Sequence, residues 1–139
     1  MFTNLEHIGI AVRDLDAANQ LFSTLLNTPP YKAEAVPTEG VLTSFFRLNQ
    51  ATGTTKLELL AATRPDSPVA TYLEKRGEGI HHLAFEVSDI VAEMARLKAA
   101  GFVLLSETPK PGADNKLVCF LHPKTTNGVL IELCQERLP

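Results

Sequence analysis

The strongest constraint on the fold is an internal repeat, in which the second half of the chain resembles the first. Residues 7–15, HIGIAVRDL, align with residues 82–90, HLAFEVSDI, so that His7 and His82 are equivalent positions 75 residues apart. The similarity continues at nearly the same spacing in two further pairs: VLTSFFRL (41–48) with KLVCFLH (116–122), and KLELL (56–60) with LIELC (130–134). The sequence therefore predicts two copies of one structural module.

Each module is predicted to contain one strand, one helix and about three further strands, in the order β-α-β-β-β. Module one spans about residues 4–62 and module two about residues 80–136, within a single domain of residues 1–139. The connector, about residues 63–79, is predicted to form a short helix, because Ser67 and Pro68 are typical of a helix start and Gly77 of a helix end.

After the first strand of each module, apolar residues recur every three to four positions, as an amphipathic helix requires. The predicted positions of this pattern are Leu15, Ala18, Leu21, Phe22, Leu25 and Leu26 in module one, and Ile90, Val91, Met94, Leu97 and Lys98 in module two. We expect the first helix to be capped by Asp14 or Asp16 and the second by Ser88 or Asp89, with Gly101 ending the second.

Alternation along the strands places two histidines on faces that carry small side chains. Residues two apart in a strand point the same way, so His7 shares its face with Gly9, and His82 shares its face with Ala84. The larger aliphatic residues face the other side, which indicates a concave surface with room for a ligand. His81 lies on the apolar side, and we interpret it as structural.

Glu58 and Glu132 occupy equivalent positions between apolar neighbours. An ionised carboxylate in such a strand is costly unless a cation or hydrogen-bond donors meet it. If the two modules close around a common cleft, one divalent metal ion satisfies His7, Glu58, His82 and Glu132 together. Imidazole and carboxylate ligands suit Mn²⁺, Co²⁺, Ni²⁺, Fe²⁺ or Zn²⁺, and the sequence does not choose among them.

Charge and composition exclude several classes of function. The net charge is -3, and Lys and Arg form no stripe of the kind that binds a phosphate backbone, so we expect no nucleic-acid partner. No apolar run approaches the roughly 20 residues of a membrane span and no signal-peptide pattern is present, so we expect a soluble, cytoplasmic protein without a membrane partner. Cys119 and Cys134 are predicted to be buried thiols.

The repeated modules resemble the vicinal oxygen chelate (glyoxalase-like) superfamily, and four motifs resemble its methylmalonyl-CoA epimerases over about residues 4–136. The motifs are EHIGIAV (6–12), KLELL (56–60), DSPVATYLEKRGEGIHHLAFEV (66–87) and FLHPKTTNGVLIEL (120–133). The resemblance implies an α+β fold, in which two tandem βαβββ modules form a cupped, mostly antiparallel sheet around a metal site.

The resemblance also implies an activity, namely metal-dependent epimerisation at C2 of methylmalonyl-CoA. A proton is removed and returned through a metal-stabilised enolate. Position by position, the resemblance assigns His7, Glu58, His82 and Glu132 to a divalent metal such as Co, Mn, Ni or Zn, the same four residues that the strand patterns indicate. It further implies an acyl-CoA substrate and a homodimer.

Epimerisation is most simply achieved by two acid/base groups on opposite sides of a planar intermediate. Glu132 is predicted to be one of them. In some family members a Glu on the second strand of the module transfers a proton, and this chain has Thr43 at that position. The second group is therefore unassigned, and the candidates are Lys56, a metal-bound water, or a carboxylate from elsewhere in the chain.

Coenzyme A carries phosphates that require cationic or donor-rich surroundings. His122 and Lys124 of the HPK motif are predicted to contact it, with Lys110 and Lys116 of the predicted loop KPGADNK as further candidates. The alternative is that these residues belong to ordinary solvated turns.

Three other functions are compatible with the same residues: a glyoxalase-like isomerase acting on a glutathione hemithioacetal, an epimerase of another acyl-CoA such as ethylmalonyl-CoA, and a non-catalytic protein that binds a small molecule. A dioxygenase is disfavoured, because its iron is commonly held by two His and one carboxylate, whereas this chain offers two carboxylates. Assays with metal-loaded protein distinguish these alternatives.

Overall fold

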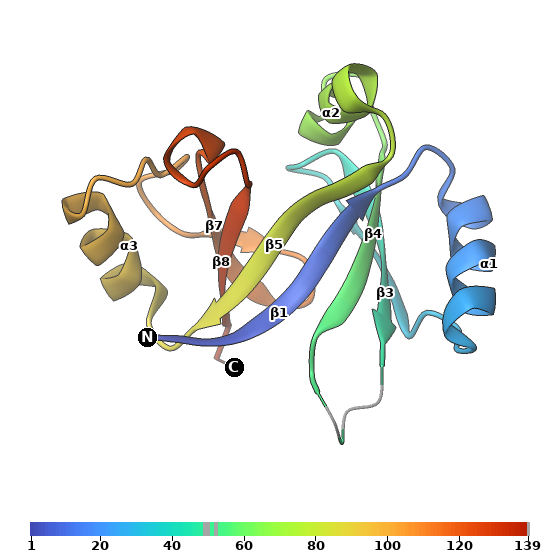
Figure 1. The fold of residues 1–139 in the computed structure, drawn as a ribbon, viewed down its shortest axis with the longest axis horizontal. Coiled ribbons are helices and arrows are strands. Elements are labelled where there is room, and N and C mark those ends of the chain that lie inside the picture. Colours follow the sequence, from blue (N-terminus) through green and yellow to red (C-terminus); the bar gives the residue numbers. More distant parts are fainter. Residues whose placement is uncertain (49–50, 52, 139) are drawn as a thin grey trace. The chain divides into compact units, whose positions relative to one another are not determined.

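The computed structural model describes residues 1–48, 51 and 53–138. The chain divides into two compact units: a first unit, His7–His81, and a second unit formed by Met1–Glu6 together with His82–Pro139. Strands β1 (Phe2–Ala11) and β5 (Gly79–Val87) each contribute residues to both units (Figure 1). Among the described residues, no helix has both the length and the apolar character that a membrane span requires.

The first unit is a mixed sheet with the strand order β2-β3-β4-β1. Neighbouring strands pair antiparallel from β2 to β4, whereas β4 and β1 run parallel. Its other elements are α1 (Leu15–Leu26), β2 (Lys32–Val36), β3 (Val41–Arg47), β4 (Lys56–Ala62) and α2 (Pro68–Arg76).

Helix α1 packs against the face of this sheet that carries Ile10 and Val12 (Figure 1). It begins at the predicted cap Asp14, whose side chain accepts a hydrogen bond from the Ala17 amide. The prediction that Leu21 and Leu25 belong to the apolar face is wrong, because these side chains are 60% and 68% exposed. The inward stripe is narrower than the apolar pattern of the sequence, and it consists of Leu15, Ala18, Phe22 and Leu26.

Helix α2 confirms the short helix predicted between Ser67 and Gly77. The Ser67 side chain caps its start by accepting a hydrogen bond from the Val69 amide, and Gly77 ends it with a positive φ of 77°. Val69 and Leu73 pack against Ala11 of β1 and other buried residues. Both faces of the first-unit sheet are therefore covered by a helix along part of their length.

The second unit repeats this arrangement with the strand order β1-β5-β8-β7-β6. Strands β5 and β8 run parallel, whereas β8, β7 and β6 pair antiparallel. Its other elements are α3 (Ile90–Ala99), β6 (Lys110–Gly112), β7 (Lys116–Leu121), the 3₁₀ helix η1 (Pro123–Thr125) and β8 (Ile131–Glu136). The α+β class and the two βαβββ modules are thus confirmed.

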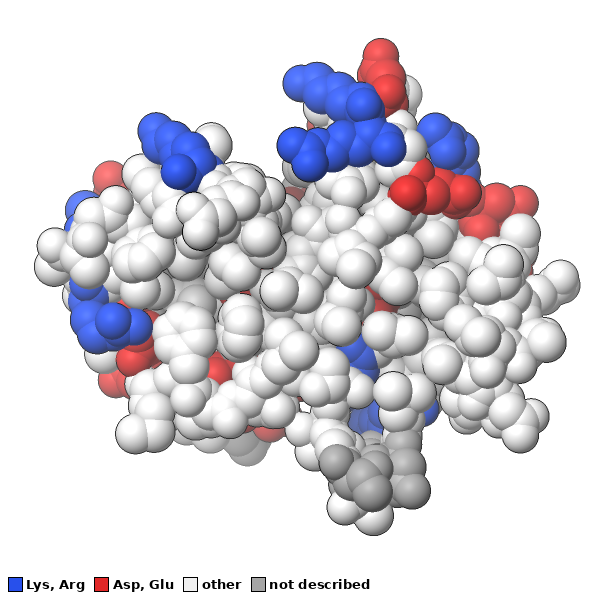
Figure 2. All heavy atoms as spheres, in the orientation of Figure 1, with Lys and Arg blue, Asp and Glu red and all other residues white. Residues whose placement is uncertain are grey.

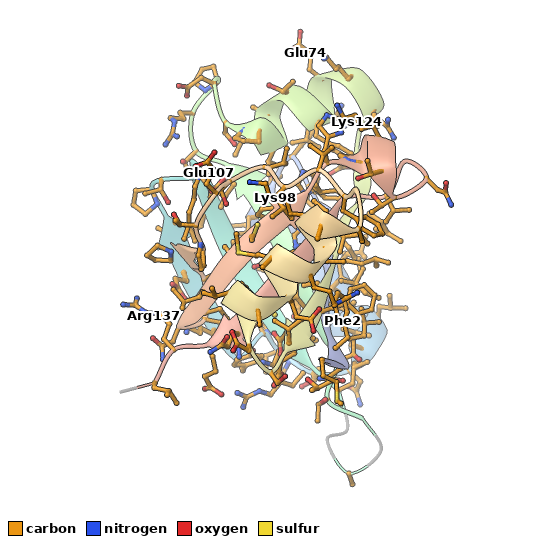
Figure 3. All side chains as sticks on the ribbon, turned by 90° about the vertical axis from the view of Figure 1, so that its left-hand side faces the viewer. Phe2, Glu74, Lys98, Glu107, Lys124 and Arg137 are labelled. Atoms are coloured by element: carbon orange, nitrogen blue, oxygen red, sulfur yellow. The ribbon has the colours of Figure 1, made fainter. Side chains whose placement is uncertain are left out.

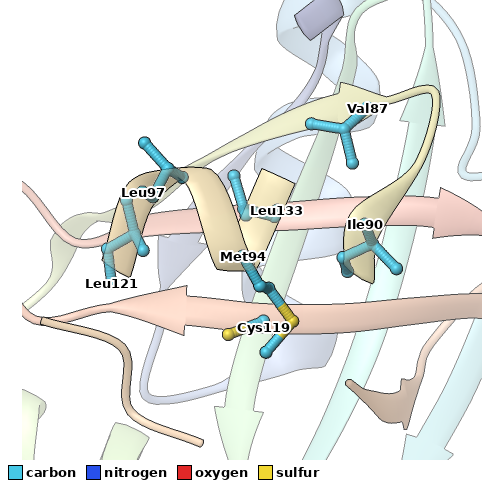
Figure 4. Close-up of a cluster of buried hydrophobic side chains, with 7 residues drawn as sticks. All are labelled: Val87, Ile90, Met94, Leu97, Cys119, Leu121 and Leu133. Carbon is cyan, nitrogen blue, oxygen red and sulfur yellow. The ribbon is translucent and has the colours of Figure 1, made fainter. Parts of the chain in front are cut away.

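Helix α3 packs on β7 and β8 over an apolar core (Figure 4). Asp89 caps the helix, as one of the two predicted alternatives, and Gly101 follows its end with a φ of 98°. Val91 was predicted to face the core and instead is 63% exposed. The core consists of Val87, Ile90, Met94, Leu97, Cys119, Leu121 and Leu133. Both cysteines are free and buried, as predicted.

Candidate metal and substrate site

His7 and Glu58 form a buried pair in the first unit. They extend from the parallel strands β1 and β4, where Gly9 is the residue directly opposite Glu58. The His7 Nε2 atom lies 3.5 Å from Glu58 Oε1, and the two side chains are 6% and 5% exposed. Because glycine has no side chain, the space beside the Glu58 carboxylate stays open to the histidine ring.

His82 and Glu132 form the equivalent pair in the second unit. They extend from the parallel strands β5 and β8, where Ala84 is the residue directly opposite Glu132. The His82 Nε2 atom lies 3.4 Å from Glu132 Oε1, and the side chains are 2% and 8% exposed. The repeat in the sequence is therefore also a repeat of side-chain geometry.

A phenylalanine accompanies each pair, and sequence reasoning did not single it out. The Phe45 ring meets His7 edge to face, with ring centroids 6.5 Å apart, and the Phe120 ring meets His82 in the same way at 5.7 Å. Each phenylalanine stands directly across the sheet from the glutamate of its pair. The signal was present, because Phe45 and Phe120 have the same 75-residue separation as the two histidines.

The residues that share a face with His7 and Glu58 follow from the strand register. Thr43 is buried on β3 and stands opposite Glu34 of β2, whose backbone carbonyl accepts a hydrogen bond from the Thr43 hydroxyl at 3.0 Å. Lys56 is half-buried on β4, opposite His7. Arg47 lies at the end of β3, with its guanidinium 3.9 Å from the centre of the Tyr31 ring.

Comparison with known proteins connects this geometry to a family. Residues 6–120 match the family model described as the Glyoxalase/Bleomycin resistance protein/Dioxygenase superfamily. The chain belongs to this superfamily. Within it, the chain is closely related to methylmalonyl-CoA epimerases. It is 44% identical over 137 residues to the ethylmalonyl-CoA/methylmalonyl-CoA epimerase of Cereibacter sphaeroides, with 97% of this chain and 99% of that protein covered.

Solved structures of superfamily members agree with this relationship. The crystal structure of methylmalonyl-CoA epimerase from Mycobacterium tuberculosis superposes with a TM-score of 0.93 at 35% identity, covering 99% of this chain and 90% of that one. A variant of the Streptomyces coelicolor methylmalonyl-CoA epimerase, solved in complex with 2-nitronate-propionyl-CoA, superposes with a TM-score of 0.92 at 34% identity, covering 99% and 100%.

The donor atoms of this superfamily member fit a divalent metal ion. His7, His82 and Glu132 are buried and offer ligand atoms of the types that hold such an ion, and Glu58 adds a second buried carboxylate. Two ligand atoms bound at about 2.1 Å in tetrahedral geometry lie about 3.4 Å apart. The separations of 3.5 Å and 3.4 Å within the two pairs are therefore compatible with ligation of one ion by both members of a pair.

The residues predicted to contact coenzyme A have different surroundings. His122 is half-buried at the start of η1, where its Nδ1 accepts a hydrogen bond from the Lys124 amide at 3.0 Å. The Lys124 side chain is exposed at the surface of η1 (Figure 3). Lys110 is also exposed. The prediction that Lys110 and Lys116 lie in a loop is wrong, because they begin the paired strands β6 and β7, and Lys116 is buried.

The structure also places cations on α2 that sequence reasoning did not consider. Lys75 and Arg76 occupy the last turn of this helix and are exposed, and Figure 2 shows Lys and Arg side chains gathered over α2. These cations lie near the carboxyl end of the helix, where positive charge is favourable for the helix itself. They therefore have a structural explanation that requires no ligand.

Burial perturbs two titratable groups near the pairs. Burial raises the pKa of the Cys134 thiol, and the nearby Glu132 and Glu6 carboxylates raise it further, so that Cys134 stays protonated at neutral pH. Burial also lowers the pKa of His81, whose ring packs edge to face on Tyr72 with centroids 4.9 Å apart. A neutral, packed ring agrees with the interpretation of His81 as structural.

Proposed function

We propose that this protein epimerises methylmalonyl-CoA at C2, using a divalent metal ion held by His7, Glu58, His82 and Glu132. The observation that carries the proposal is the repeated, buried His–Glu pair in a chain closely related to methylmalonyl-CoA epimerases. When bound, the metal stabilises negative charge on a substrate oxygen as a Lewis acid. The residues of the chain must then bind the substrate and move the C2 proton.

Glu132 is proposed to transfer the C2 proton on one side of the substrate. The proton lies between a thioester and a carboxylate, so the electron pair left on its removal is delocalised onto oxygen. Glu132 is buried, so few water molecules compete with it as proton donors to the deprotonated carbon, while its small exposed fraction still allows its own proton to exchange with solvent. His122 and Lys124 are proposed to contact the coenzyme A portion, since both lie in the HPK motif at the start of η1.

The decisive experiment incubates the metal-loaded protein with one epimer of methylmalonyl-CoA in D₂O. We expect deuterium to enter at C2 while the single epimer becomes a mixture, and both changes to stop after chelation of the metal and resume when it is restored. Absence of exchange in protein with bound metal would contradict the proposal. Conversion of a glutathione hemithioacetal by the same preparation would favour a glyoxalase-like isomerase instead.

The Glu132 assignment is tested by Glu132→Gln, which keeps the size of the side chain but removes its basic carboxylate. We expect C2 exchange to fall by at least about 100-fold, the usual contribution of a positioned acid/base group. Metal content must be measured in parallel, because Glu132 is also a proposed ligand. Exchange at the wild-type rate in this variant would refute the assignment.

Ethylmalonyl-CoA is a second candidate substrate, because the Cereibacter sphaeroides relative is named for both acyl-CoAs. The two substrates differ by one methylene group, which a pocket discriminates by about 10- to 200-fold at most. We expect comparison of kcat/KM for the two substrates to show the preference. A homodimer, a cytoplasmic location and a single-domain organisation of residues 1–139 remain predictions, and sedimentation of a particle of about twice 15.2 kDa would support the first.

A further inference from the structure

Arg47 and Lys56 bring two positive charges face to face in the first unit. They are direct partners in the antiparallel β3–β4 pair, so both side chains emerge on the same face of the sheet. Like charges directly opposite one another destabilise a sheet. This pair is therefore a cost to folding that a negatively charged ligand would offset.

The two cations lie beside the buried His7–Glu58 pair of the same unit. Lys56 is the direct partner of His7 in the parallel β1–β4 pair, and Glu58 follows two residues later on the same face of β4. Two residues of a strand span about 6.7 Å. An anion held by these cations is therefore close to the pair that is proposed to bind the metal.

A series of ring contacts holds the Arg47 guanidinium in place. The guanidinium carbon lies 3.9 Å from the centre of the Tyr31 ring. The Tyr31 ring packs on Phe45 with centroids 6.1 Å apart, and Phe45 is the ring that meets His7. The Tyr31 amide also donates a hydrogen bond to the Phe45 carbonyl at 2.9 Å, which anchors Tyr31 to β3. Arg47 is thereby positioned by the chain itself.

Stacking on Tyr31 leaves the hydrogen-bond donors of Arg47 available. A guanidinium stacks through its flat face, whereas its N–H groups point outward in the plane and match the two oxygens of a carboxylate. In the part of the chain that the structure describes, the Arg47 guanidinium forms no ion pair, and the residue is exposed. The Lys32 ammonium of the neighbouring strand differs, because it already pairs with Glu34 at 3.2 Å.

The place of Arg47 and Lys56 indicates which negative group they bind. The proposed substrate carries phosphates on coenzyme A and a free carboxylate on the carbon that is epimerised. The pantetheine arm separates the phosphates from this carbon, whereas the carboxylate is attached directly to it. A site two residues along the strand from Glu58 therefore suits the carboxylate rather than the phosphates.

We propose that Arg47 binds the free carboxylate of the acyl group, with Lys56 adding positive charge beside it; this inference rests on the proposed function. The guanidinium donates two parallel N–H hydrogen bonds to the carboxylate oxygens. Arg47 is then a specificity-determining residue, because an acyl-CoA without this carboxylate leaves its charge facing Lys56 without compensation. The protein therefore selects 2-carboxyacyl-CoA esters over simple acyl-CoA esters.

Binding of two CoA esters to Arg47→Met tests this role. Methylmalonyl-CoA and propionyl-CoA differ by the free carboxylate, and calorimetry with metal-loaded protein measures the Kd of each. We expect Arg47→Met to bind methylmalonyl-CoA at least about tenfold more weakly than wild type, the usual effect of losing hydrogen bonds between charged groups. Its Kd for propionyl-CoA should stay close to the wild-type value. Arg47→Lys, which keeps the charge but loses the planar fork, should fall between wild type and Arg47→Met.

Arg76→Met is the matched control, because Arg76 is another exposed arginine of the first unit, in the last turn of α2. This variant should keep the wild-type preference for methylmalonyl-CoA. Metal content and melting temperature are measured for every variant, so that a lost ion or a disturbed fold is not mistaken for a lost contact.

The outcomes separate this assignment from the proposed function. Equal weakening of both esters by Arg47→Met, or no weakening of either, would overturn the assignment. The same selective loss in Arg76→Met would also overturn it, because the loss would then reflect overall charge and not a defined contact. Wild-type protein without a preference for methylmalonyl-CoA would show that Arg47 binds no carboxylate. The proposed function is judged independently, by exchange of the C2 proton in D₂O.

Discussion

The carboxylate of each proposed metal pair faces a residue with little or no side chain. Gly9 lies opposite Glu58 and Ala84 lies opposite Glu132, so a polar pair fits within strands whose other side is apolar. This arrangement agrees with the strand alternation, which placed each histidine and each glutamate on a face with small side chains; their role as metal ligands stays a prediction.

Phe45 and Phe120 escaped prediction, because an aromatic residue in a strand is usually part of a core. The pairing of β2 with β3 also escaped prediction, because the sequence located only the second of these strands.

At the residue scale, Glu93 gives a prediction about pH. The Met1 amino group and the Arg96 guanidinium hold the pKa of the Glu93 carboxyl below its ordinary value of about 4.5. A carboxyl group whose pKa is lower in the folded state than in the unfolded state stabilises the protein at pH values above its unfolded-state pKa. This stabilisation is lost as the pH falls through the folded-state pKa. We expect Glu93→Gln to lower the free energy of unfolding at pH 7 and to reduce its loss between pH 5 and pH 3.

Urea denaturation at several pH values measures this effect. Glu74→Gln is the control, since Glu74 is an exposed carboxylate on α2 (Figure 3). Equal pH dependence in wild type and Glu93→Gln would show that the ion pairs of Glu93 contribute nothing to folding.

At the element scale, the helices were easier to predict than the short outer strands. Asp14, Ser67 and Asp89 cap helices as expected, because their side chains bond to free amides within three residues. In contrast, β2 and β6 are strands of five and three residues that exist through pairing with β3 and β7. Pairing is a long-range property, and such short segments carry too little alternation to reveal it.

Ser67→Ala tests the cap of α2. The buried Ser67 hydroxyl accepts a hydrogen bond from the Val69 amide at 3.1 Å, so removal of the hydroxyl leaves this amide without its acceptor. We expect a loss of about 1 kcal/mol in the free energy of unfolding, the usual cost of removing such a cap. Glu74→Ala, an exposed change within the same helix, should change stability by less than about 0.5 kcal/mol. Equal effects of both variants on urea unfolding would argue against the cap.

Gly112 of β6 is predicted to be required for close packing on β7. A Cβ atom at this position would lie 2.7 Å from Val118 Cγ1, which is too close for any side chain. We expect Gly112→Ala to destabilise the protein by about 1–3 kcal/mol. In the background of Val118→Ala the same change should cost at least about 0.5 kcal/mol less, because the opposing methyl groups are gone. Strict additivity in this double-mutant cycle would contradict the prediction.

At the scale of the whole molecule, binding of the proposed metal ion should stabilise the folded chain. Since the assembled ligand set exists only in the folded chain, binding should raise stability by about 2.7 kcal/mol at a metal concentration 100 times Kd. We expect a higher melting temperature with Co²⁺ than with EDTA, and no such difference in His82→Ala. An equal shift in this variant would place the stabilising metal elsewhere.

The sharing of β1 between the units has a consequence for how the chain is made. Residues 1–6 belong to the second unit, whose other residues lie more than 75 positions later in the chain. The Thr3 hydroxyl donates a hydrogen bond to the Glu86 carbonyl, and the Ser88 amide donates one to the Met1 carbonyl. During synthesis, all residues of the first unit leave the ribosome before the second half of the chain does. The contacts of residues 1–6 with the second half can form only later, and closing so long a loop is expected to slow folding.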